Sequence, residues 1–587
     1  MSRKPLLLSP AGSPAALSAA INAGADEVYI GGSAFNARIN ASNFDSSALI
    51  KAGELCRSSN VALHITLNTL IYNKELEQVL DYVSFLNENV HPNALIVQDL
   101  GVVKLLRQNF PDLPLHASTQ MRIHSPLDAK YLKDLGFTRA VLARELPKED
   151  IKAFADTELE TEIFVHGAIC VSESGGCLMS SLIGGRSGNR GECAQPCRLH
   201  YKSANKYPLS LKDMCLASHI TEISDIGVTS LKIEGRMKSP EYVAGVTSIY
   251  RRLIDENRNA TQTELNRLSD IFSRSGFTDG YFTGKINKAM FGVRTEEDKK
   301  RSNERFLATK AQIRPKASSA SAPSSFILPE RDLSKTLPLS KQKGLVLRFE
   351  NTPPSDSFLK KYAPKAIRID IPLSACSDKR FAKYSEKISA LIPRSIFLSE
   401  LDSVKTQISA AKKNGICNAT ISSLNHITLC DGMFLHGDYV FNVTNKETLS
   451  MLEGYSLSSV MLSPETNGKF IRKANCALEY ILYGRTPLMY TRTCIISNIG
   501  GCKHSDKCFS QLTDRTGARF PVFSGPNHTN TIYNSVPSYR LDKKSELKKA
   551  GINLFTLFFT DEDEKQIENI ISLYESEGKP NFEYTRR

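Results

Sequence analysis

The chain has 587 residues, of which 41% are hydrophobic and 23% charged, so its composition excludes a disordered tail and allows two or more hydrophobic cores. No apolar run reaches the ~18 residues that span a membrane, and only three leucines follow Lys4. We therefore expect a cytoplasmic protein without a membrane helix or a secretory signal. The formal charge of +13 favours a polyanionic partner such as a nucleic acid.

The first 240 residues alternate short apolar runs with amphipathic stretches, which is the pattern of a parallel sheet wrapped by helices. We expect eight strands, at residues 6–8, 27–30, 63–67, 94–98, 115–117, 140–143, 162–165 and 230–233. Eight strands with intervening helices over this length predict an α/β fold, a (β/α) barrel of TIM type covering residues 1–255.

Polar residues follow most of these expected strands, at the end of the barrel where active sites of this fold lie. Any one of them could simply belong to a solvated loop, but polar residues are found at the ends of most of the expected strands. The candidate catalytic residues are His116, Arg144, Glu145, His166, Lys232, Glu234 and Arg236.

A cysteine-rich stretch follows the seventh expected strand and offers Cys170, Cys177, Cys193 and Cys197, with Cys215 a little further on. Cysteines can simply be buried as small apolar residues, but these lie among glycine, arginine and glutamate. A sulfur-rich set without a dedicated histidine favours iron–sulfur or zinc binding. A site with four ligands could take Cys197 or Cys215 as the fourth, and we expect Cys215.

The rest of the chain begins with residues 256–316, expected as a helical and basic extension, and a Ser/Pro-rich linker at residues 317–341. Residues 434–465 then align with residues 114–145 without a gap, which matches His436 with His116. This duplication predicts a degenerate, barrel-like repeat over residues 342–587. Because Tyr483 stands where the first copy has His166, we do not expect a second active site.

The motifs ETEIFVHGAIC, RSGNRGECAQPCR, LSLKDMC and SLKIEGRMKSPEYV, in a match running from about Leu6 to Tyr281, resemble the family of collagenase-like peptidases. Characterised bacterial members of that family include prephenate-dependent RNA hydroxylases and a pair of iron–sulfur proteins of oxygen-independent ubiquinone hydroxylation. The segment GRSGNRGECAQPCRLHY is more similar to the branch that forms 5-hydroxycytidine in ribosomal RNA than to the tRNA uridine branch. The resemblance thus implies an iron–sulfur enzyme that hydroxylates a pyrimidine in rRNA, or in tRNA as the alternative.

The resemblance also implies roles for the strand-end residues. Prephenate would be a co-substrate, and its two carboxylates call for cations such as Arg144, Arg236 and Lys232. His116 and His166 are candidates to carry a proton near neutral pH. The cysteine-rich stretch would hold a 4Fe–4S cluster.

A second cysteine set lies in the repeat and resembles the cluster site of one protein of the ubiquinone pair. It consists of Cys376, Cys494, Cys502 and Cys508, and we expect a second 4Fe–4S cluster there. A zinc site that uses His504 as its fourth ligand is the alternative.

Two other functions stay open at this point. The family name implies a peptidase, although the sequence contains neither an HExxH motif nor a GxSxG motif. Two cysteine-bearing halves in one chain are also compatible with a hydroxylase of a small aromatic such as a quinone precursor. The basic charge favours an RNA substrate over a peptide or a small aromatic.

Overall fold

The computed structural model describes residues 4–39, 41–203, 205–300, 302, 343–466, 474–503 and 508–585. The chain forms two compact units. The first comprises Met1–Leu328 and Met489–Thr531, and the second comprises Pro329–Leu488 and Ile532–Arg587. Residues 489–531, expected in the second domain, thus belong to the first unit, and we call them the returning segment. The expected linker at residues 317–341 lies outside the described residues.

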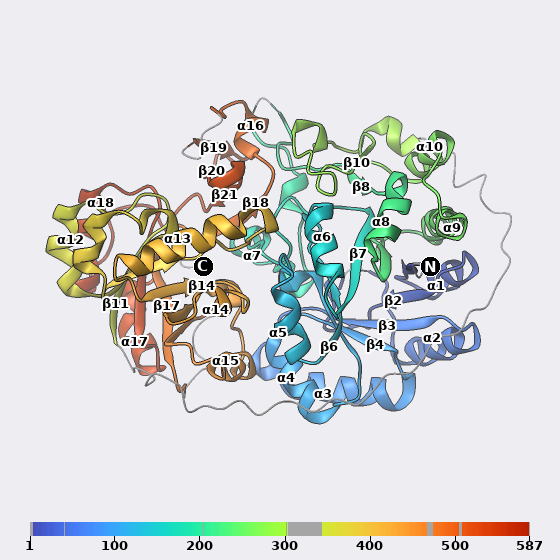
Figure 1. Cartoon of the computed structure of the whole chain (residues 1–587), viewed down its shortest axis with the longest axis horizontal. Coiled ribbons are helices and arrows are strands. Elements are labelled where there is room, and N and C mark those ends of the chain that lie inside the picture. The colour runs from blue at the N-terminus through green and yellow to red at the C-terminus, as the bar shows by residue number, and fades with distance from the viewer. Residues whose placement is uncertain are drawn as a thin grey trace. The chain divides into compact units, whose positions relative to one another are not determined.

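The first unit contains a closed barrel of eight parallel strands, which confirms the predicted fold (Figure 1). They are β1 (Leu6–Pro10), β2 (Glu27–Ile30), β3 (Ala62–Leu67), β4 (Ala94–Val97), β5 (Leu115–Ala117), β6 (Phe137–Val141), β7 (Glu160–Gly167) and β9 (Ser230–Ile233). Strand β9 pairs with both β7 and β1, and this closes the barrel. Strand β6 both begins and ends earlier than expected. Its expected end was too late because the buried Leu142 and Ala143 continue the apolar pattern into the following loop.

Helices cover the outside of this barrel, and their ends follow ordinary capping chemistry. They are α1 (Pro14–Asn22), α2 (Ser46–Ser58), α3 (Leu76–Phe85), α4 (Leu100–Asn109), α5 (Asp128–Asp134), α6 (Lys148–Ala155), α8 (Ile220–Ile226) and α9 (Pro240–Glu256). The hydroxyl of Ser13 accepts the amide of Ala16 at the start of α1, and Thr261 forms a capping box with Glu264 at α10 (Gln262–Ile271). Helix α10 is the helical part of the expected extension.

Two short strands extend the barrel at the carboxyl end of β7. Strand β8 (Asp213–Cys215) runs antiparallel to β7, with Cys215 opposite His166, and β10 (Phe277–Thr278) pairs with β8. Between β7 and β8 lie residues 168–212, which we call the cysteine loop and which include helix α7 (Met179–Gly184). The loop is therefore held at the end of the barrel where active sites of this fold lie.

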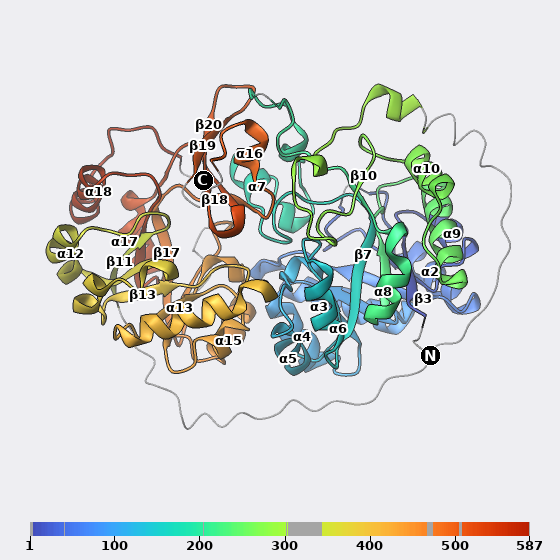
Figure 2. The ribbon, with the colours of Figure 1, turned by 45° about the horizontal axis from the view of Figure 1, so that its top comes forward.

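The second unit contains another closed barrel of eight parallel strands, which confirms the predicted repeat (Figure 2). They are β11 (Gly344–Phe349), β12 (Ala366–Pro372), β13 (Ile388–Leu391), β14 (Asn418–Ile421), β15 (Phe434–Gly437), β16 (Ser459–Met461), β17 (Ala477–Gly484) and β23 (Leu554–Phe559). Its helices are α12 (Asp356–Tyr362), α13 (Leu401–Lys413), α14 (His426–Leu429), α15 (Lys446–Glu453), α17 (Lys544–Lys549) and α18 (Glu564–Ser576). Strand β23 pairs with β17 and β11.

Each barrel encloses buried charges that neutralise one another. In the first, Glu162 accepts from Lys232 at 2.7 Å and from Arg139 at 3.2 Å. In the second, Glu479 takes the place of Glu162 and accepts from Arg368 at 2.8 Å. Thr556 stands at the position of Lys232 and donates to Glu479 at 2.5 Å, so the second barrel keeps the carboxylate but loses the lysine.

The returning segment includes most of β18 (Pro487–Thr491), α16 (Ile495–Ile499), β19 (Phe509–Thr513), β20 (Arg519–Ser524) and the start of β21 (Asn530–Tyr533). Its backbone is bonded to the cysteine loop. The amide of Glu173 donates to the carbonyl of Tyr490, and the amide of Lys202 donates to that of Thr513, each at 2.7 Å. The side chain of Asn498 donates to the carbonyl of Pro208 at 2.8 Å. These bonds tie the loop to sequence about 300 residues away.

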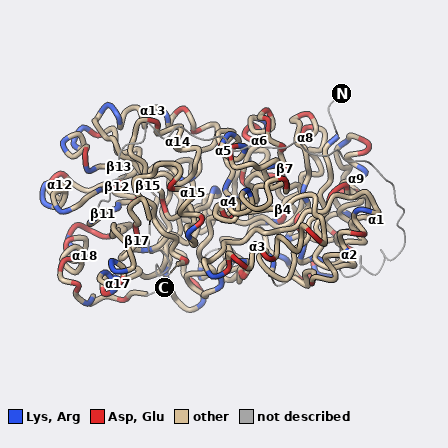
Figure 3. The backbone as a smooth tube through the Cα atoms, turned by 90° about the horizontal axis from the view of Figure 1, so that it is seen from below, with Lys and Arg blue, Asp and Glu red and all other residues tan. Residues whose placement is uncertain are grey.

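The outer helices carry both signs of charge. Figure 3 shows Lys and Arg interspersed with Asp and Glu along the helices visible in that view. None of the described helices combines the length and the apolar character needed to cross a bilayer.

Candidate functional site

A cavity of about 340 Å³ lies at the carboxyl ends of the strands of the first barrel. Residues in or after the barrel strands form one part of its wall, and the cysteine loop forms another. Arg274 and, from the returning segment, Met489 also line it. Charged residues among its described lining are mainly basic. They are Arg38, Arg144, Arg198, Lys232, Arg236, Lys238 and Arg274 against Glu173 and Glu234. The cavity is therefore suited to an anionic ligand.

Four cysteines of the loop, Cys170, Cys177, Cys193 and Cys197, line this cavity together. Cys170 and Cys193 keep exposed surface because they face the cavity. Burial raises the pKa of Cys197 to about 12, and burial together with the neighbouring thiols raises the pKa of Cys177 well above its usual value. Thiols in this arrangement lose their protons when a metal centre binds to their sulfur atoms. Four sulfur donors in one cavity fit an iron–sulfur cluster or zinc.

Cys215, which we expected as the fourth ligand, is not among the described residues that line the cavity. It is buried in β8, where its Sγ lies 3.7 Å from the hydroxyl of Tyr250. Burial raises the pKa of this thiol to about 11. The structure therefore favours Cys197 over Cys215. Strand β8 runs antiparallel to β7 and places Cys215 opposite His166. The spacing of the cysteines along the sequence does not reveal this reversal of the chain.

Residues between the cysteines fix the course of the loop. Arg190 forms two hydrogen bonds with the carboxylate of Glu75, at 2.7 and 2.9 Å, and lies over the ring of Tyr72. Gly191 follows with φ of 84°, and a Cβ there would lie 2.3 Å from the carbonyl oxygen of Asn36. The sequence NRGEC thus combines an anchoring arginine with a glycine that no larger residue can replace without movement.

Glu145 has a different role from the expected catalytic one. It is buried and accepts from His124 Nε2 at 2.7 Å and from the amide and hydroxyl of Ser174 at 2.9 Å each. Burial opposes ionisation of this carboxyl, but these hydrogen bonds outweigh it and hold the pKa at about 2. The residue anchors the cysteine loop to the barrel and is not among the described lining residues.

Two of the cavity's arginines are paired with one carboxylate. Glu234 accepts from Arg38 at 3.3 Å and from Arg144 at 3.1 Å, and Arg144 stacks on the ring of Phe164. Lys232 is likewise engaged by Glu162 and lies 4.5 Å from the centre of the Tyr29 ring. Arg38 was missed from the sequence because it lies eight residues beyond β2, away from any strand end.

Two other arginines have neutral partners. Arg236 donates to Asn36 Oδ1 and Thr66 Oγ1 at 3.1 Å each, and Arg198 donates to Ser210 Oγ at 2.8 Å. Neither forms an ion pair with any described residue. Burial and the neighbouring Arg38 lower the pKa of Arg236 to about 10, so it remains a cation at neutral pH. These side chains supply positive charge that a bound anion would neutralise.

Neither expected histidine is among the described residues that line the cavity. His116 lies inside the barrel with its ring 4.7 Å from that of His64, and burial lowers its pKa well below the usual range. His166 lies beside Tyr250, and burial lowers its pKa to about 3. Both rings are therefore neutral and turned away from a ligand in the cavity.

Lys238 was not expected as a site residue, yet it lines the cavity. Burial lowers its pKa to about 7, with Asp213 opposing this and Arg274 adding to it. Its Nζ lies 2.9 Å from the centre of the Phe272 ring. Among the described lining residues it is the group best matched to proton exchange near neutral pH.

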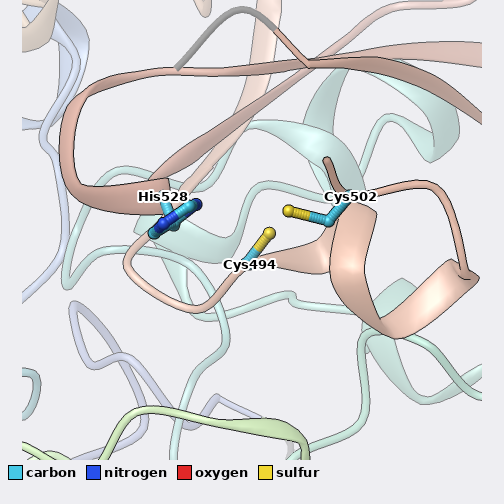
Figure 4. Close-up of side chains that lie close together, drawn as sticks. All are labelled: Cys494, Cys502 and His528. Carbon is cyan, nitrogen blue, oxygen red and sulfur yellow. The ribbon is translucent and has the colours of Figure 1, made fainter. Parts of the chain in front are cut away.

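The second cysteine set is divided between the units. Cys376 is buried in the second unit, with its thiol 3.6 Å from the carbonyl oxygen of Pro372. Cys494, Cys502 and Cys508 lie in the returning segment of the first unit. Cys494 and Cys502 converge there with His528, which sequence spacing did not single out (Figure 4). His504, the expected zinc ligand, lies outside the described residues.

Comparison with known proteins gives a consistent set of relatives. The 23S rRNA 5-hydroxycytidine C2501 synthase of Escherichia coli is 42% identical over 300 residues, which cover 48% of this chain but 43% of that protein. The tRNA hydroxylation protein P1 of Bacillus subtilis is 34% identical, covering 50% of this chain and 74% of that one. An uncharacterized protease of Methanocaldococcus jannaschii is 36% identical, covering 48% and 74%.

The family model of peptidase family U32 matches residues 12–291, which include the cysteine loop and all the described lining residues of the cavity except Met489. The match does not reach the returning segment or the second barrel. From this match and the coverage of these relatives, the chain belongs to peptidase family U32.

Proposed function

We propose that the chain is an iron–sulfur RNA hydroxylase, prephenate-dependent and independent of molecular oxygen. The main support for this proposal is that four cysteines and several basic side chains line the same cavity. The relatives named for rRNA and tRNA hydroxylation support RNA as the substrate. We place rRNA first, with 5-hydroxycytidine as the product, and tRNA second.

The cysteines of the loop fit a cluster better than a single ion. A tetrahedral zinc ion with bonds of about 2.3 Å needs its sulfur ligands roughly 4 Å apart. Within the described residues, the loop cysteines form no group of three whose sulfurs all lie within 4.8 Å. A cluster of four irons spreads its ligands more widely, so Cys170, Cys177, Cys193 and Cys197 would hold it. When bound, such a cluster supplies a redox-active iron site.

The chain's own residues would bind and orient the co-substrate. Prephenate carries two carboxylates, and Arg236 and Arg198 present guanidinium groups that no described carboxylate neutralises. Arg144 and Lys232 are already paired with Glu234 and Glu162, so we assign them a supporting role. Of the three cations expected from the sequence to bind the carboxylates of prephenate, we therefore keep Arg236, and we add Arg198.

The base would have to leave its stack to reach the cavity, as bases do in other enzymes that modify them. Asn68, Gln120 and Thr66 line the wall with groups that can hydrogen-bond the base edge. Lys238 would receive or return a proton there, because its pKa is close to neutrality.

A peptidase remains the competing function, because one relative is named a protease. A cysteine peptidase needs a thiolate beside a histidine base. No histidine is among the described lining residues, and burial raises the pKa of Cys170 and Cys197. The described cavity thus favours the hydroxylase.

The test uses rRNA from an Escherichia coli strain that lacks its own 5-hydroxycytidine synthase. The chain, purified without oxygen, is incubated with this rRNA and prephenate, and nucleosides are identified by mass spectrometry. We expect a cytidine that has gained one oxygen. Cys193→Ser should lose both iron and product. Arg236→Met should keep its iron but lower kcat/KM for prephenate roughly 10- to 100-fold, as expected for lost hydrogen bonds to a charged group.

Arg252→Met is the matched control, because Arg252 is half exposed on α9 and lies 3.9 Å from Glu264. It should behave as the wild type. Unmodified rRNA, together with unmodified tRNA from a strain lacking tRNA hydroxylation, would contradict the proposal. Peptide cleavage that persists after iron removal would point to the peptidase instead.

A further inference from the structure

Three side chains of the returning segment bring their ligand atoms together. The Sγ atoms of Cys494 and Cys502 and a ring nitrogen of His528 all lie within 4.8 Å of one another. Figure 4 shows the two sulfur atoms pointing toward each other, with the imidazole beside them. This grouping is tighter than that of the loop cysteines and lies outside the region that matches family U32.

A fourth donor, Cys508, lies next to this group. The amide of Lys503, the residue after Cys502, donates to Cys508 Sγ at 3.3 Å. The backbone of Cys508 is fixed by Ser524, whose hydroxyl accepts its amide at 2.7 Å and whose amide donates to its carbonyl at 2.9 Å. The sulfur of Cys508 is thereby held within one peptide unit of Cys502.

The surrounding backbone is arranged as in a metal site. The amide of Ser497 donates to Cys494 Sγ at 3.3 Å, as that of Lys503 does to Cys508. Hydrogen bonds of this kind orient the ligands of metal ions. Asn527 and His528 both have left-handed backbones, with φ of 54° and 59°. Two successive non-glycine residues in this region are uncommon, and they turn the imidazole toward the cysteines.

We propose that one zinc ion is bound here by four side chains, Cys494, Cys502, Cys508 and His528. Three thiolates and one imidazole are a common ligand set for structural zinc, whereas 4Fe–4S clusters ordinarily take four cysteines. The separations below 4.8 Å among Cys494, Cys502 and His528 also suit a single tetrahedral ion, and Cys508 would be its fourth ligand. This ligand set differs from the second iron–sulfur cluster expected from the sequence: Cys376 is buried with its thiol beside the carbonyl of Pro372, and we assign its place to His528.

The zinc ion would fix the segment that holds the cysteine loop. It would join Cys494 at the start of α16, Cys502 and Cys508 before β19, and His528 before β21. The same segment accepts the amides of Glu173, between Cys170 and Cys177, and of Lys202, after Cys197, and α16 supplies Asn498. Zinc bound at one end would thereby restrict the mobility of the cavity wall without touching the ligand.

Elemental analysis of the whole 587-residue chain, purified without oxygen, tests this site independently of the hydroxylase proposal. We expect about one zinc per chain in addition to iron. Zinc-edge X-ray absorption should show three sulfur ligands at about 2.3 Å and one nitrogen at about 2.0 Å. Cys502→Ser and His528→Ala should each lose the zinc, while the iron stays bound because the hydrogen bonds of Tyr490, Thr513 and Asn498 to the cysteine loop remain.

Two further variants keep the test informative if these fold poorly. His528→Cys should retain zinc, with a fourth sulfur replacing the nitrogen in the absorption spectrum. Cys417→Ser is the matched control, because Cys417 is exposed in the second unit and should leave zinc unchanged.

Wild-type protein without zinc would overturn the proposal, as would zinc that persists in both Cys502→Ser and His528→Ala. Loss of iron and acid-labile sulfide from Cys494→Ser, with no zinc in the wild type, would show a second cluster instead. Failure of RNA hydroxylation with zinc present would reject the proposed function and leave this site standing.

Discussion

Lys238 shows how strongly its surroundings set the charge of a single side chain. It lies over Phe272 among the cations Arg274 and Arg294, and one carboxylate, Asp213, opposes their effect. Glu234 contributes a weaker attraction. Burial dominates, and the pKa falls from 10.5 to about 7. Between these values the unfolded chain binds a proton that the folded chain does not.

The first prediction concerns the stability of the Lys238→Met variant. Because the unfolded state binds more protons, the stability of the wild type rises with pH from about 7 toward 10.5. Below pH 7 the wild type carries the full cost of a buried charge. Lys238→Met removes that cost, so it should stabilise the chain most at pH 6, and its advantage should shrink steadily toward pH 10. Chemical denaturation of both proteins across this range measures the difference.

Lys285→Met serves as the control, because Lys285 is not one of the charges that set the pKa of Lys238. Its difference from the wild type should not change with pH in this window. A Lys238→Met difference that is constant with pH would mean that the lysine is protonated throughout.

At the residue scale, the rule that chemistry follows strand ends correctly selected Arg144, Lys232, Glu234 and Arg236 as cavity residues. It also selected His116, which is buried inside the barrel, because the sequence shows where a strand ends but not how deep in the barrel a side chain lies. Lys238 and Arg38 escaped it because they lie in loops that fold back over the barrel. His528 was not singled out because the left-handed turn that positions it follows the cysteines at a distance along the sequence.

The cysteine loop is the element on which the proposed cluster depends, and its conformation rests on few contacts. Its described residues contain one short α-helix and two single-turn 3-10 helices, and the rest have little regular structure. Arg190 and Gly191 fix it on one side and Glu145 on the other. A change at one of these contacts should therefore affect the loop more than the barrel.

The second prediction is that Gly191→Ala disrupts this loop. A Cβ would lie 2.3 Å from the carbonyl oxygen of Asn36, and the φ of 84° is unfavourable for alanine. We expect a local cost of about 1 to 3 kcal/mol, with less iron per chain and an unchanged barrel transition. Iron analysis and hydrogen exchange of the loop measure both effects.

Gly184→Ala is the matched control, because Gly184 lies in the same loop with no atom within 4 Å of an added Cβ. It should bind iron as the wild type does. Equal iron in both variants would show that the loop adapts freely at residue 191.

At the element scale, strands were predictable where two features coincided, an apolar run and flanking turn residues. All eight strands of the first barrel satisfied this. Strand β8 was not expected, since its three residues Asp213–Cys215 are mixed in polarity and owe their conformation to pairing with β7. That tertiary pairing also decides the position of Cys215, so its distance from the cavity lining could not be inferred from spacing.

The first barrel carries the cysteine-lined cavity, and the second has the same fold without the lysine of the first. The second retains a buried carboxylate at Glu479 but replaces the lysine of the first barrel with Thr556. It also sends the chain back into the first unit at Met489. The alignment of residues 434–465 with residues 114–145 predicted the repeat, but nothing in it indicated that residues 489–531 leave the barrel.

The third prediction tests whether the first unit needs this returning segment. A chain ending at residue 300 contains the region matched by family U32 and all eight strands of the first barrel, but it lacks the bonds to Tyr490, Thr513 and Asn498. Each lost hydrogen bond costs roughly 1 kcal/mol, and the exposed loop amides must be solvated instead. We expect the circular dichroism of a folded barrel with much less iron per chain than the 587-residue protein, both reconstituted in parallel. Full iron content in the shortened chain would show that the cysteine loop is ordered by the barrel alone, and the returning segment would then have no part in forming the cluster site.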